Sequence, residues 1–507
     1  MNAFKKTYIF IFAACFIMLA CSPTYAQESF KLSDYKNPDY SYRLLDFNFN
    51  MNGGSFSNNE KFDDLNNSRS NWGFNANLQP RYIARKNNAR YQGYQQAGLG
   101  ITPAWSQNKI ALESPVVQER ERKTGSQSFA FFATSSNRFY NQKQQFVEIG
   151  LNLNSGLGLQ KSTFKSTPAS YPFFYKLSYQ ESDIDISIPL MVGKGRIEEV
   201  QDARLALYIL EDLEKSGDLT RKPDANEVLE LAHFITSIKN ERYFDQRLRH
   251  ISEITAVDSL LNAMGLKGNS GASYFTLLND NWSHSSGPVR QSGSRLSFGI
   301  VPTVRFFSGN DLQYYNDSVA NQTQLTDYKN EHSRIRSNSG LEFMTRYSLE
   351  KPINLHWQNS TSFSAGYGIN NEHERRKYIE NEIVVSDEKF DDIFQRLFVS
   401  ASNTVGYYPN SRTSILLTAN VHYQRNFFDK PEDANETYEY SPSYVGAGIL
   451  VFANYYVSPR LRFNVEMSSN ASFRTVETKI SGASPEQKIQ ANNIGTYLNA
   501  GFVYSIF

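Results

Sequence analysis

The sequence has 507 residues, with 52 basic and 51 acidic side chains and a formal charge of +1. This balance argues against the basic surface with which proteins bind nucleic acids. Hydrophobic residues make up 40% of the chain. Beyond the N-terminus no run approaches the ~20 apolar residues of a membrane helix, which excludes a polytopic helical membrane protein. Disorder fits poorly as well, because 31 Tyr and 36 Phe are far more aromatics than disordered chains contain.

The N-terminus has the three parts of a secretory signal peptide. Two lysines give it a positive start, residues 8–20 form a short apolar stretch, and Ala26 ends a small-residue cleavage site. Cleavage there would remove residues 1–26 and with them Cys15 and Cys21, so the mature chain would have no disulfide or thiolate chemistry. Lipid attachment at Cys21 is the alternative interpretation of this segment.

Apolar and polar residues alternate in many stretches of the remaining chain. In the clearest of them, Val465 and Met467 share one parity, whereas Glu466 and Ser468 share the other. Period 2 predicts strands with one apolar and one polar face. A strand that crosses a bilayer at a tilt needs about 9–11 residues, and several of these stretches are long enough. The pattern recurs near residues 46–51, 72–82, 147–154, 295–306, 355–367, 414–427, 445–457 and 460–476.

We therefore predict an all-β transmembrane antiparallel barrel of about 14 strands, about six before Lys194 and about eight after Gly287. Long polar connections, such as residues 308–333 and 371–392, are expected to form the outer loops. A water-soluble β-sandwich with one polar face is the alternative. A barrel of this size has an interior too wide for side chains to fill, so we expect a wet lumen. Short turns are expected near residues 86–88, 141–142, 351–352, 409–411 and 458–459.

The last predicted strand, residues 496–507, ends on Phe507, with Phe502 and Tyr504 shortly before it. A C-terminal strand that stops on Phe resembles those of the porin-like outer-membrane β-barrels of Gram-negative bacteria. This resemblance is to a class and points to no functional family. It implies a location in the cell outer membrane, contact with its lipid, and recognition of these three aromatic residues by the barrel-assembly machinery. The parity of this strand that faces lipid is left open.

The hydrophobic period changes between the two groups of strands. Residues 200–216 have the amphipathic pattern of a helix that ends at Gly217, and Asp224 with Glu227 forms a capping box for a second helix. A slip of phase leaves open whether the apolar residues that follow form one bent helix or two. Because long and short connections alternate, the segment is expected on the periplasmic side. It is interpreted as a self-packed cap, a docking module for a periplasmic protein partner, or a plug of the lumen.

The predicted organisation is thus a signal peptide at 1–26, barrel strands 1 to 6 within 27–194, a periplasmic helical insert at 195–286, and barrel strands 7 to 14 within 287–507. Neither the histidines nor the carboxylates have a spacing that predicts a metal site or a catalytic group. We expect no enzyme activity, no cofactor and no bound metal.

Charged residues and histidines on the inner parity of the strands are the candidates for lining the lumen. They are Arg295, Arg305, Arg346, His356, His422, Arg462, Glu466 and Arg474. Together with the wet interior, they predict a channel or transporter for small hydrophilic solutes. The alternative is a non-transporting membrane anchor or scaffold. In that case its helical insert or outer loops would bind a partner for secretion, surface display or envelope assembly.

Overall fold

In the computed structural model, the described residues are 30–62, 65–113, 117–167, 173–239, 246–269, 271–284, 290–318, 325–428, 438–458, 461–479 and 487–504. The predicted signal peptide and Phe507 lie outside them.

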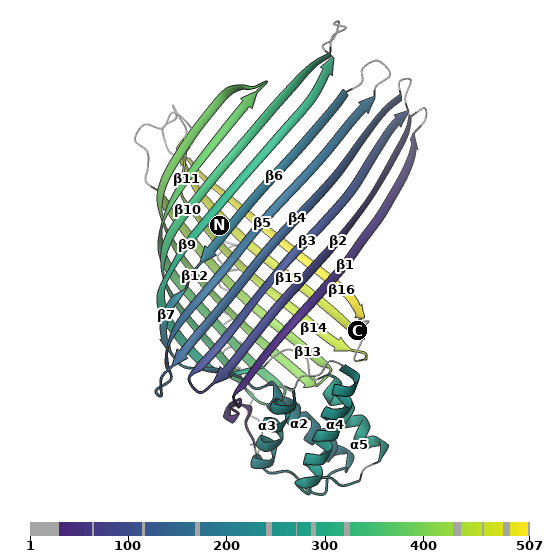
Figure 1. Cartoon of the computed structure of the whole chain (residues 1–507), viewed down its shortest axis with the longest axis vertical. Helices are drawn as coiled ribbons and strands as arrows, with labels where there is room; N and C mark the ends of the chain where they lie inside the picture. The colour runs from purple at the N-terminus through teal and green to yellow at the C-terminus, as the bar shows by residue number, and fades with distance from the viewer. Residues whose placement is uncertain are drawn as a thin grey trace, which may run out of the picture.

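The chain forms one antiparallel sheet that curls into a barrel, with a helical domain beyond one end (Figure 1). Its main path has the order β1-β2-β3-β4-β5-β6-β9-β10-β11-β12-β13-β14-β15-β16, six strands before the helices and eight after them. This order confirms the predicted antiparallel barrel of about 14 strands. The strands of the main path are β1 (Tyr40–Phe62), β2 (Leu65–Asn88), β3 (Tyr91–Glu113), β4 (Val117–Tyr140), β5 (Gln145–Thr167), β6 (Phe173–Ser187), β9 (Gln291–Ser318), β10 (Leu325–Pro352), β11 (Trp357–Glu380), β12 (Ile383–Asn410), β13 (Thr413–Phe428), β14 (Tyr438–Tyr456), β15 (Leu461–Lys479) and β16 (Gln487–Tyr504).

Two short strands lie off this path, β7 (Leu190–Lys194) and β8 (Ile197–Glu199). β7 pairs with β5 and β9 and so continues the line of β6. Between β6 and β7, the Ile188 N–H donates to the carbonyl oxygen of Pro302 at 3.1 Å. The Gly150 N–H donates to the carbonyl oxygen of Pro189 at 2.8 Å. Proline has no N–H for a ladder, so the interruption falls where the chain cannot continue regular pairing.

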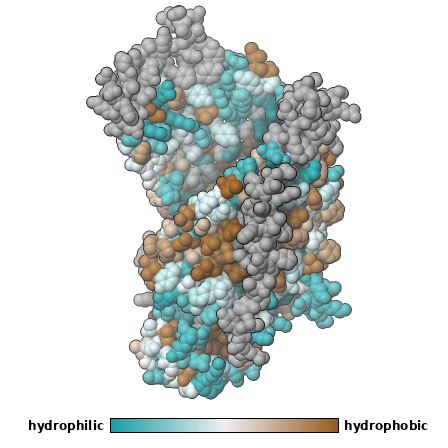
Figure 2. Space-filling view, turned by 180° about the vertical axis from the view of Figure 1, so that it is seen from behind, coloured by the Kyte–Doolittle hydropathy of each residue, from teal (hydrophilic) through white to brown (hydrophobic). Residues whose placement is uncertain are grey.

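Apolar side chains cover the outside of the barrel. On β9, Leu296 and Phe298 are 50% and 59% exposed, whereas their neighbour Ser297 is buried. Figure 2 shows hydrophobic atoms across the middle of the molecule and mainly hydrophilic ones toward its two ends. A surface of this kind is unfavourable in water and suited to lipid. It confirms the predicted alternation. Similarly exposed residues include Phe47, Phe49, Met51, Val147, Ile149, Leu190, Val192, Phe343, Phe363, Met467, Leu498 and Phe502.

The two ends of the barrel differ in their connections. At the end that we call the turn end, short turns join β2 to β3, β4 to β5, β10 to β11, β12 to β13 and β14 to β15, where the sequence predicted them. At the opposite end, the loop end, the strands are longer than predicted. The expected loop at 371–392 was wrong, because β11 continues to Glu380 and β12 begins at Ile383. Only Asn381 and Glu382 separate them, with φ of 47° and 70°, as a type I′ hairpin turn requires.

The long loop expected at 308–333 was wrong for the same reason, because β9 runs to Ser318 and β10 begins at Leu325. Polar side chains hold these extensions together. Arg375 donates from Nε to Asp387 Oδ1 at 2.7 Å, and Arg336 donates from Nη2 to Glu372 Oε2 at 2.5 Å. Beyond the bilayer, both faces of these strands carry charged residues, so the alternation of apolar and polar residues is lost there. The sequence pattern therefore marks the lipid-facing part of each strand and misses the rest.

In the described part of the chain between β8 and β9 there are four helices. They are α2 (Gln201–Ser216), α3 (Ala225–Lys239), α4 (Gln246–Ala263) and α5 (Ala272–Ser283). They lie beyond the turn end, outside the barrel (Figure 1), which removes the interpretation of the helices as a plug of the lumen. None of the helices among the described residues is both long enough and apolar enough to cross a membrane.

Local signals in the sequence position the first helices. Gly217 has a φ of 74° and ends α2 as predicted. Asp224 Oδ1 accepts the N–H groups of Asn226 and Glu227 at 2.8 and 2.9 Å, and Glu227 Oε2 accepts the N–H of Asp224 at 2.8 Å. This reciprocal pattern is the predicted capping box. The apolar residues after α3 lie in α4, and residues 240–245, on which the choice between one bent helix and two depends, lie outside the described residues. The helix α5 was not predicted.

The helical domain has its own hydrophobic core, to which the segment before β1 contributes. Tyr35 is 1% exposed, and its hydroxyl lies 2.8 Å from Thr236 Oγ1 on α3. The ring of Tyr35 also contacts His233, with 5.4 Å between the ring centroids. The domain is therefore attached to the beginning of the barrel as well as to its middle. The core residues are Phe30, Leu32, Tyr35, Val200, Ala203, Leu205, Ala206, Ile209, Leu210, Leu213, Val228, Leu231, Ala232, Ile235, Ile238, Val257, Leu261, Leu266, Tyr274, Leu278 and Trp282.

Candidate functional site

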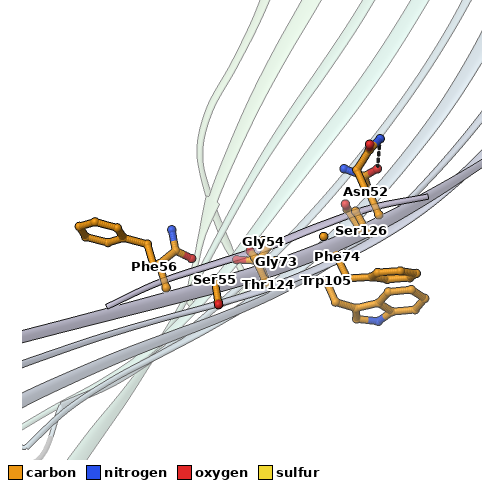
Figure 3. A pocket seen from close by; sticks show the side chains of 14 residues that line it. Asn52, Gly54, Ser55, Phe56, Gly73, Phe74, Trp105, Thr124 and Ser126 are labelled. Atoms are coloured by element: carbon orange, nitrogen blue, oxygen red, sulfur yellow. Dashed lines mark hydrogen bonds between the residues drawn. The ribbon is translucent and has the colours of Figure 1, made fainter. Parts of the chain in front are cut away.

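The inner face of the barrel is polar, and its chemistry changes from one wall to another. On β1 and β2 the register pairs Asn50 with Asn77 and Asn52 with Asn75. Figure 3 shows this wall, where Asn52 Nδ2 donates to Asn75 Oδ1 at 3.4 Å beside a cavity of about 590 Å³. Gly54 is paired with Gly73 in the same register, so the wall carries no side chain there. This wall offers amide groups and open space, with no formal charge between Asn48 and Phe56 on β1.

Charges lie on the opposite wall, formed by β6, β9, β10 and β12. Arg305 Nε lies 3.0 Å from Asp185 Oδ2, and Arg396 forms an ion pair with Glu342. A Cβ added at Gly368 would lie 2.7 Å from Glu342 Cγ. Glycine therefore leaves the room in which this carboxylate side chain extends along the wall. We call these paired charges on β6, β9, β10 and β12 the charged belt.

Near the turn end, polar side chains from strands that are not neighbours in the sheet meet. Arg138 and Glu148 form a two-point ion pair, with Nε to Oε2 at 2.8 Å and Nη2 to Oε1 at 3.2 Å. Arg295 on β9 donates from Nη2 to Gln92 Oε1 on β3 at 3.2 Å. The Tyr140 hydroxyl donates to the same Gln92 oxygen at 3.0 Å. β3 and β9 are not neighbours in the sheet, so the contact between Gln92 and Arg295 crosses the lumen.

A short segment completes this floor. We call residues 195–199 the strap, because they leave β7 and turn inward before the helices begin. Two glycines permit this path: Gly195 has a φ of 99° and Gly293, its neighbour on β9, has a φ of 120°. A Cβ at Gly195 would lie 2.2 Å from the Ser294 carbonyl oxygen, and one at Gly293 would lie 2.1 Å from that of Arg196. No other residue fits at either position without moving the backbone.

Arg196 fixes the strap to the turn between β2 and β3. Its Nη2 donates to Asn87 Oδ1 at 2.8 Å and to the Asn88 carbonyl oxygen at 2.9 Å. Its Nη1 donates to the Ala89 carbonyl oxygen at 3.1 Å, and its guanidinium lies 5.0 Å from the centroid of the Tyr140 ring. The Arg196 guanidinium thus connects the strap to three consecutive residues, Asn87, Asn88 and Ala89.

Two further contacts hold the strap down. Arg85 Nη1 lies 2.8 Å from Glu199 Oε1, and Gln92 Nε2 donates to the Ile197 carbonyl oxygen at 3.0 Å. Burial raises the pKa of the Glu199 carboxyl, although Arg85 acts in the opposite direction. Arg85, Asn87 and Gln92 all belong to the inner register, so the strap covers part of the turn-end opening from within.

The helical domain rests on the turns of the barrel. The Tyr208 hydroxyl on α2 donates to the Tyr408 carbonyl oxygen at 2.8 Å. Arg204 is 3% exposed, and its guanidinium lies 5.8 and 5.7 Å from the ring centroids of Tyr208 and Tyr408. Burial lowers the pKa of Arg204 and raises that of Tyr208 to about 12. At neutral pH the charged Arg204 guanidinium therefore makes cation–π contacts with the uncharged rings of Tyr208 and Tyr408.

The structure brings together two of the residues expected to line the lumen. Arg295 lies in the floor, and Arg346 interacts electrostatically with Glu148 and Arg138 of the same cluster. Arg305 belongs to the charged belt higher in the barrel. His356 lies in the turn before β11, where its Nδ1 is 2.9 Å from the Tyr408 carbonyl oxygen.

The remaining candidates lie on β13 and β15. His422 lines a cavity of about 330 Å³ with Asn420, Tyr444 and Asn470. On β15, Arg462 lies 5.8 Å from the Tyr456 ring centroid. The register also places Glu466 opposite Phe452 and Arg474 opposite Tyr444.

The aromatic end of the chain is partly described. Phe502 is 68% exposed, and its ring centroid lies 4.9 Å from that of Phe463 on the outside of β15. The even residues of β16 therefore face outward, which settles the parity that the sequence left open. Tyr504 is the last residue of β16 and pairs with Leu461.

Within the described residues, His, Cys, Asp and Glu form no group of three or more that could hold a metal ion. The sequence matches no protein-family model and no curated protein.

Several solved structures are similar to this chain at a low level. The translocator domain of the autotransporter NalP from Neisseria meningitidis is 8% identical, with a TM-score of 0.20, and the match covers 83% of this chain and 90% of that chain. OmpT of Vibrio cholerae is 10% identical, with a TM-score of 0.21 and coverage of 91% and 97%. The ferric yersiniabactin uptake receptor FyuA from Yersinia pestis is 7% identical, with a TM-score of 0.26 and coverage of 92% and 72%.

Because these TM-scores are low, the protein class is assigned from the features of the chain itself. Its long antiparallel strands carry an apolar outer surface and a polar inner face, and only helices or barrels of this kind span a membrane. The even residues of the last strand present Phe502 to the outside. On these features, the chain is a β-barrel of the outer-membrane class, located in the outer membrane.

Proposed function

We propose that the barrel is a channel for small hydrophilic solutes whose floor is closed by the strap. The observation that carries the proposal is the mainly polar inner face, with an amide wall on β1 and β2 and charged side chains on β6, β9, β10 and β12. Side chains of this kind can replace part of the water around a small polar solute. In this proposal the turn end faces the periplasm, so the strap limits passage at the inner mouth.

Opening the floor requires the loss of the Arg196 contacts. Its side chain is 13% exposed and donates three hydrogen bonds to the turn between β2 and β3. A hydrogen bond from a charged group contributes about 1.5–3 kcal/mol when it is made within the protein. The closed floor is therefore stable at rest, and the channel conducts weakly until the strap moves.

Single-channel recording in planar bilayers tests this proposal. We expect a small conductance for the parent protein and a larger one for Arg196→Ala, because the strap loses its hydrogen bonds to the turn between β2 and β3. The strap keeps its pairing with β9 and its contacts to Arg85 and Gln92, so the increase measures the share of closure that Arg196 provides. Arg221→Ala is the matched control, since Arg221 forms a two-point ion pair with Glu227 in the helical domain, away from the lumen. If the parent and Arg196→Ala both fold and neither conducts, the channel proposal fails.

A second candidate function, a membrane anchor without transport, is favoured by the helical domain. That domain has its own core and lies outside the barrel, where it can hold a periplasmic protein partner. Absence of conductance from both proteins in the same recordings would leave this candidate in place. In either case we propose no catalytic activity. We also propose that the aromatic end of the chain contacts the barrel-assembly machinery.

A further inference from the structure

The two edge strands of the sheet are not paired with each other among the described residues. β1 is bonded only to β2, and β16 only to β15. We call the line between β1 and β16 the seam. Figure 1 shows these two strands at the two ends of the colour scale, β1 in purple and β16 in yellow. In hydrocarbon an unpaired backbone N–H or C=O is strongly unfavourable, so the seam must close or be occupied by another molecule.

Both seam strands are poorly suited to permanent pairing. Gly53 and Gly54 are adjacent in β1, and Gly495 and Gly501 interrupt β16. Glycine weakens a strand, because it has no side chain to pack, and it leaves the register of pairing loosely specified. Tyr497, on the inner register of β16, is 54% exposed. The glycines on both edges thus leave the register of any pairing between β1 and β16 loosely specified.

The chemistry of the seam on its β1 side matches an uncharged amphiphile, and on the other side Glu466 of β15 lies opposite Asn499 of β16. Its outer surface is apolar, with Phe49 on β1 60% exposed and Leu498 on β16 68% exposed. Its inner wall offers Asn50 and Asn52, next to the cavity that Phe56 also lines. The nearest charges on the inner wall of β1 and β2, those of Asp46 and Arg81, are paired with each other at 2.8 Å.

The helical domain bridges the two sides of the seam at the turn end. On the side of β1, the preceding residue Tyr35 is buried in the domain core. On the other side, the ring of His284 at the end of α5 lies 5.6 Å from that of Tyr456, where β14 turns into β15. Arg412 Nε also donates to Asp280 Oδ2 on α5 at 3.0 Å. The domain therefore limits how far β1 and β16 can separate at the turn end. It does not restrain them toward the loop end.

From these observations we infer that the seam is a lateral exit between the lumen and the membrane for an uncharged amphiphile, clasped at the turn end by the helical domain. This exit does not rest on the solute channel proposed above, because it opens sideways and does not pass through the floor. The amphiphile keeps its polar head on the amide wall and its chain in the lipid.

Cross-linking tests whether the seam opens. In a Cys15→Ala, Cys21→Ala background, Asn50→Cys with Asn499→Cys places one thiol on each inner edge. Thr404→Cys with Thr418→Cys is the matched control on β12 and β13, where the two Oγ1 atoms lie 2.8 Å apart. We expect the control pair to form a disulfide and the seam pair to react only with longer bis-maleimide linkers. Complete disulfide formation across the seam, also with Asn48→Cys or Asn52→Cys, would show a permanently closed barrel and overturn the inference.

A photoreactive monoacylglycerol in lipid vesicles tests the ligand. We expect it to label the inner wall near Phe56, and we expect labelling to fall at least ten-fold after the seam is cross-linked with the shortest linker that reacts. The disulfide of the control pair should leave labelling unchanged. Labelling that persists in the seam-locked protein would overturn the lateral exit. Conductance is recorded on the same samples and should not change with the lock, so failure of the exit and failure of the channel are distinguishable.

Discussion

Arg290 donates from Nε to Gln358 Oε1 at 2.9 Å and so joins the segment before β9 to the start of β11. Arg290 is 0% exposed, and its Nη2 donates to the carbonyl oxygens of Asn354 and Trp357 at 2.7 and 2.9 Å. Its guanidinium also lies 5.1 Å from the Tyr408 ring centroid, on which Arg204 of α2 lies as well. One buried cation thus organises the turn that supports the helical domain.

We expect Arg290→Ala to destabilise the junction between the helical domain and the barrel strongly. Each buried carbonyl left without a donor costs about 1–3 kcal/mol, and several lose their partner at once. Limited proteolysis of the purified protein should release the helical domain faster, while heat-modifiable gel mobility still reports a folded barrel. Arg290→Lys should rescue the junction only in part, because an ammonium lacks the planar fork of donors. Resistance equal to that of the parent would contradict the assigned role.

The two faces of β15 should respond differently to a charge. Val465 shares the outward parity of Met467, which is 50% exposed, whereas Ser468 pairs with Leu450 and Tyr497 on the inner register. Arginine on the lipid side near the middle of a bilayer costs about 2–4 kcal/mol. Val465→Arg should therefore lower the yield of folded barrel, and Ser468→Arg should fold and shift ion selectivity toward anions. Equal yields of the two variants in a refolding assay would contradict the assigned faces.

Gly217 provides a test of the helical domain alone. Its φ of 74° is unfavourable for a residue with a Cβ, although no atom lies within 4 Å of the position that a Cβ would take. Gly217→Ala should therefore lower the stability of the domain by about 1 kcal/mol through backbone strain. Gly271→Ala is the control, since Gly271 has a φ of −73° and equally open surroundings. Hydrogen exchange of α2 amides measures both variants, and only the first should accelerate it.

The capping box gives a pH dependence with a defined sign. The Arg221 guanidinium holds the pKa of the Glu227 carboxyl below its usual value, and the Asp224 N–H acts in the same direction. A carboxyl whose pKa is lowered in the folded state stabilises that state above its unfolded pKa and loses the effect as the pH falls. Hydrogen exchange at the start of α3 should therefore accelerate, relative to Glu227→Gln, as the pH falls below about 4.5. A difference that is constant with pH would contradict this assignment.

Local periodicity accounts for the part of the fold that the sequence predicts. Leu296 and Phe298 face outward and Arg295 inward because successive side chains of a strand point to opposite faces, whatever their partners. Gly217 and Asp224 are equally local signals, since a helix ends or begins within one turn of them. The tight turns were found for the same reason.

Contacts between distant residues account for what the sequence misses. Nothing near Arg196 indicates that it meets Asn87, which is distant in the chain, so the sequence assigned the strap only to the start of the helical insert at 195–286. Gln92 and Arg295 meet across the lumen because of the curvature of the sheet, which the pattern of single strands does not specify. The helix α5 is short, and its buried residues Tyr274, Leu278 and Trp282 recur every fourth position, which was too few to stand out.

The position of the helical domain in the chain has a consequence for assembly. Most neighbouring strands are hairpins, as where Tyr140 pairs with Phe146, but Leu190 of β7 pairs with Ile300 of β9 across the whole insertion. Closing a flexible loop of that length costs about 2.5 kcal/mol more than closing the short hairpin. If the domain folds first on its own core, it brings its two ends together and removes most of this entropy. Two independent meanders, one from each half of the chain, would then join along β7 and β9 late in biogenesis. The folding of the helical domain, which never enters the bilayer, would determine when they join.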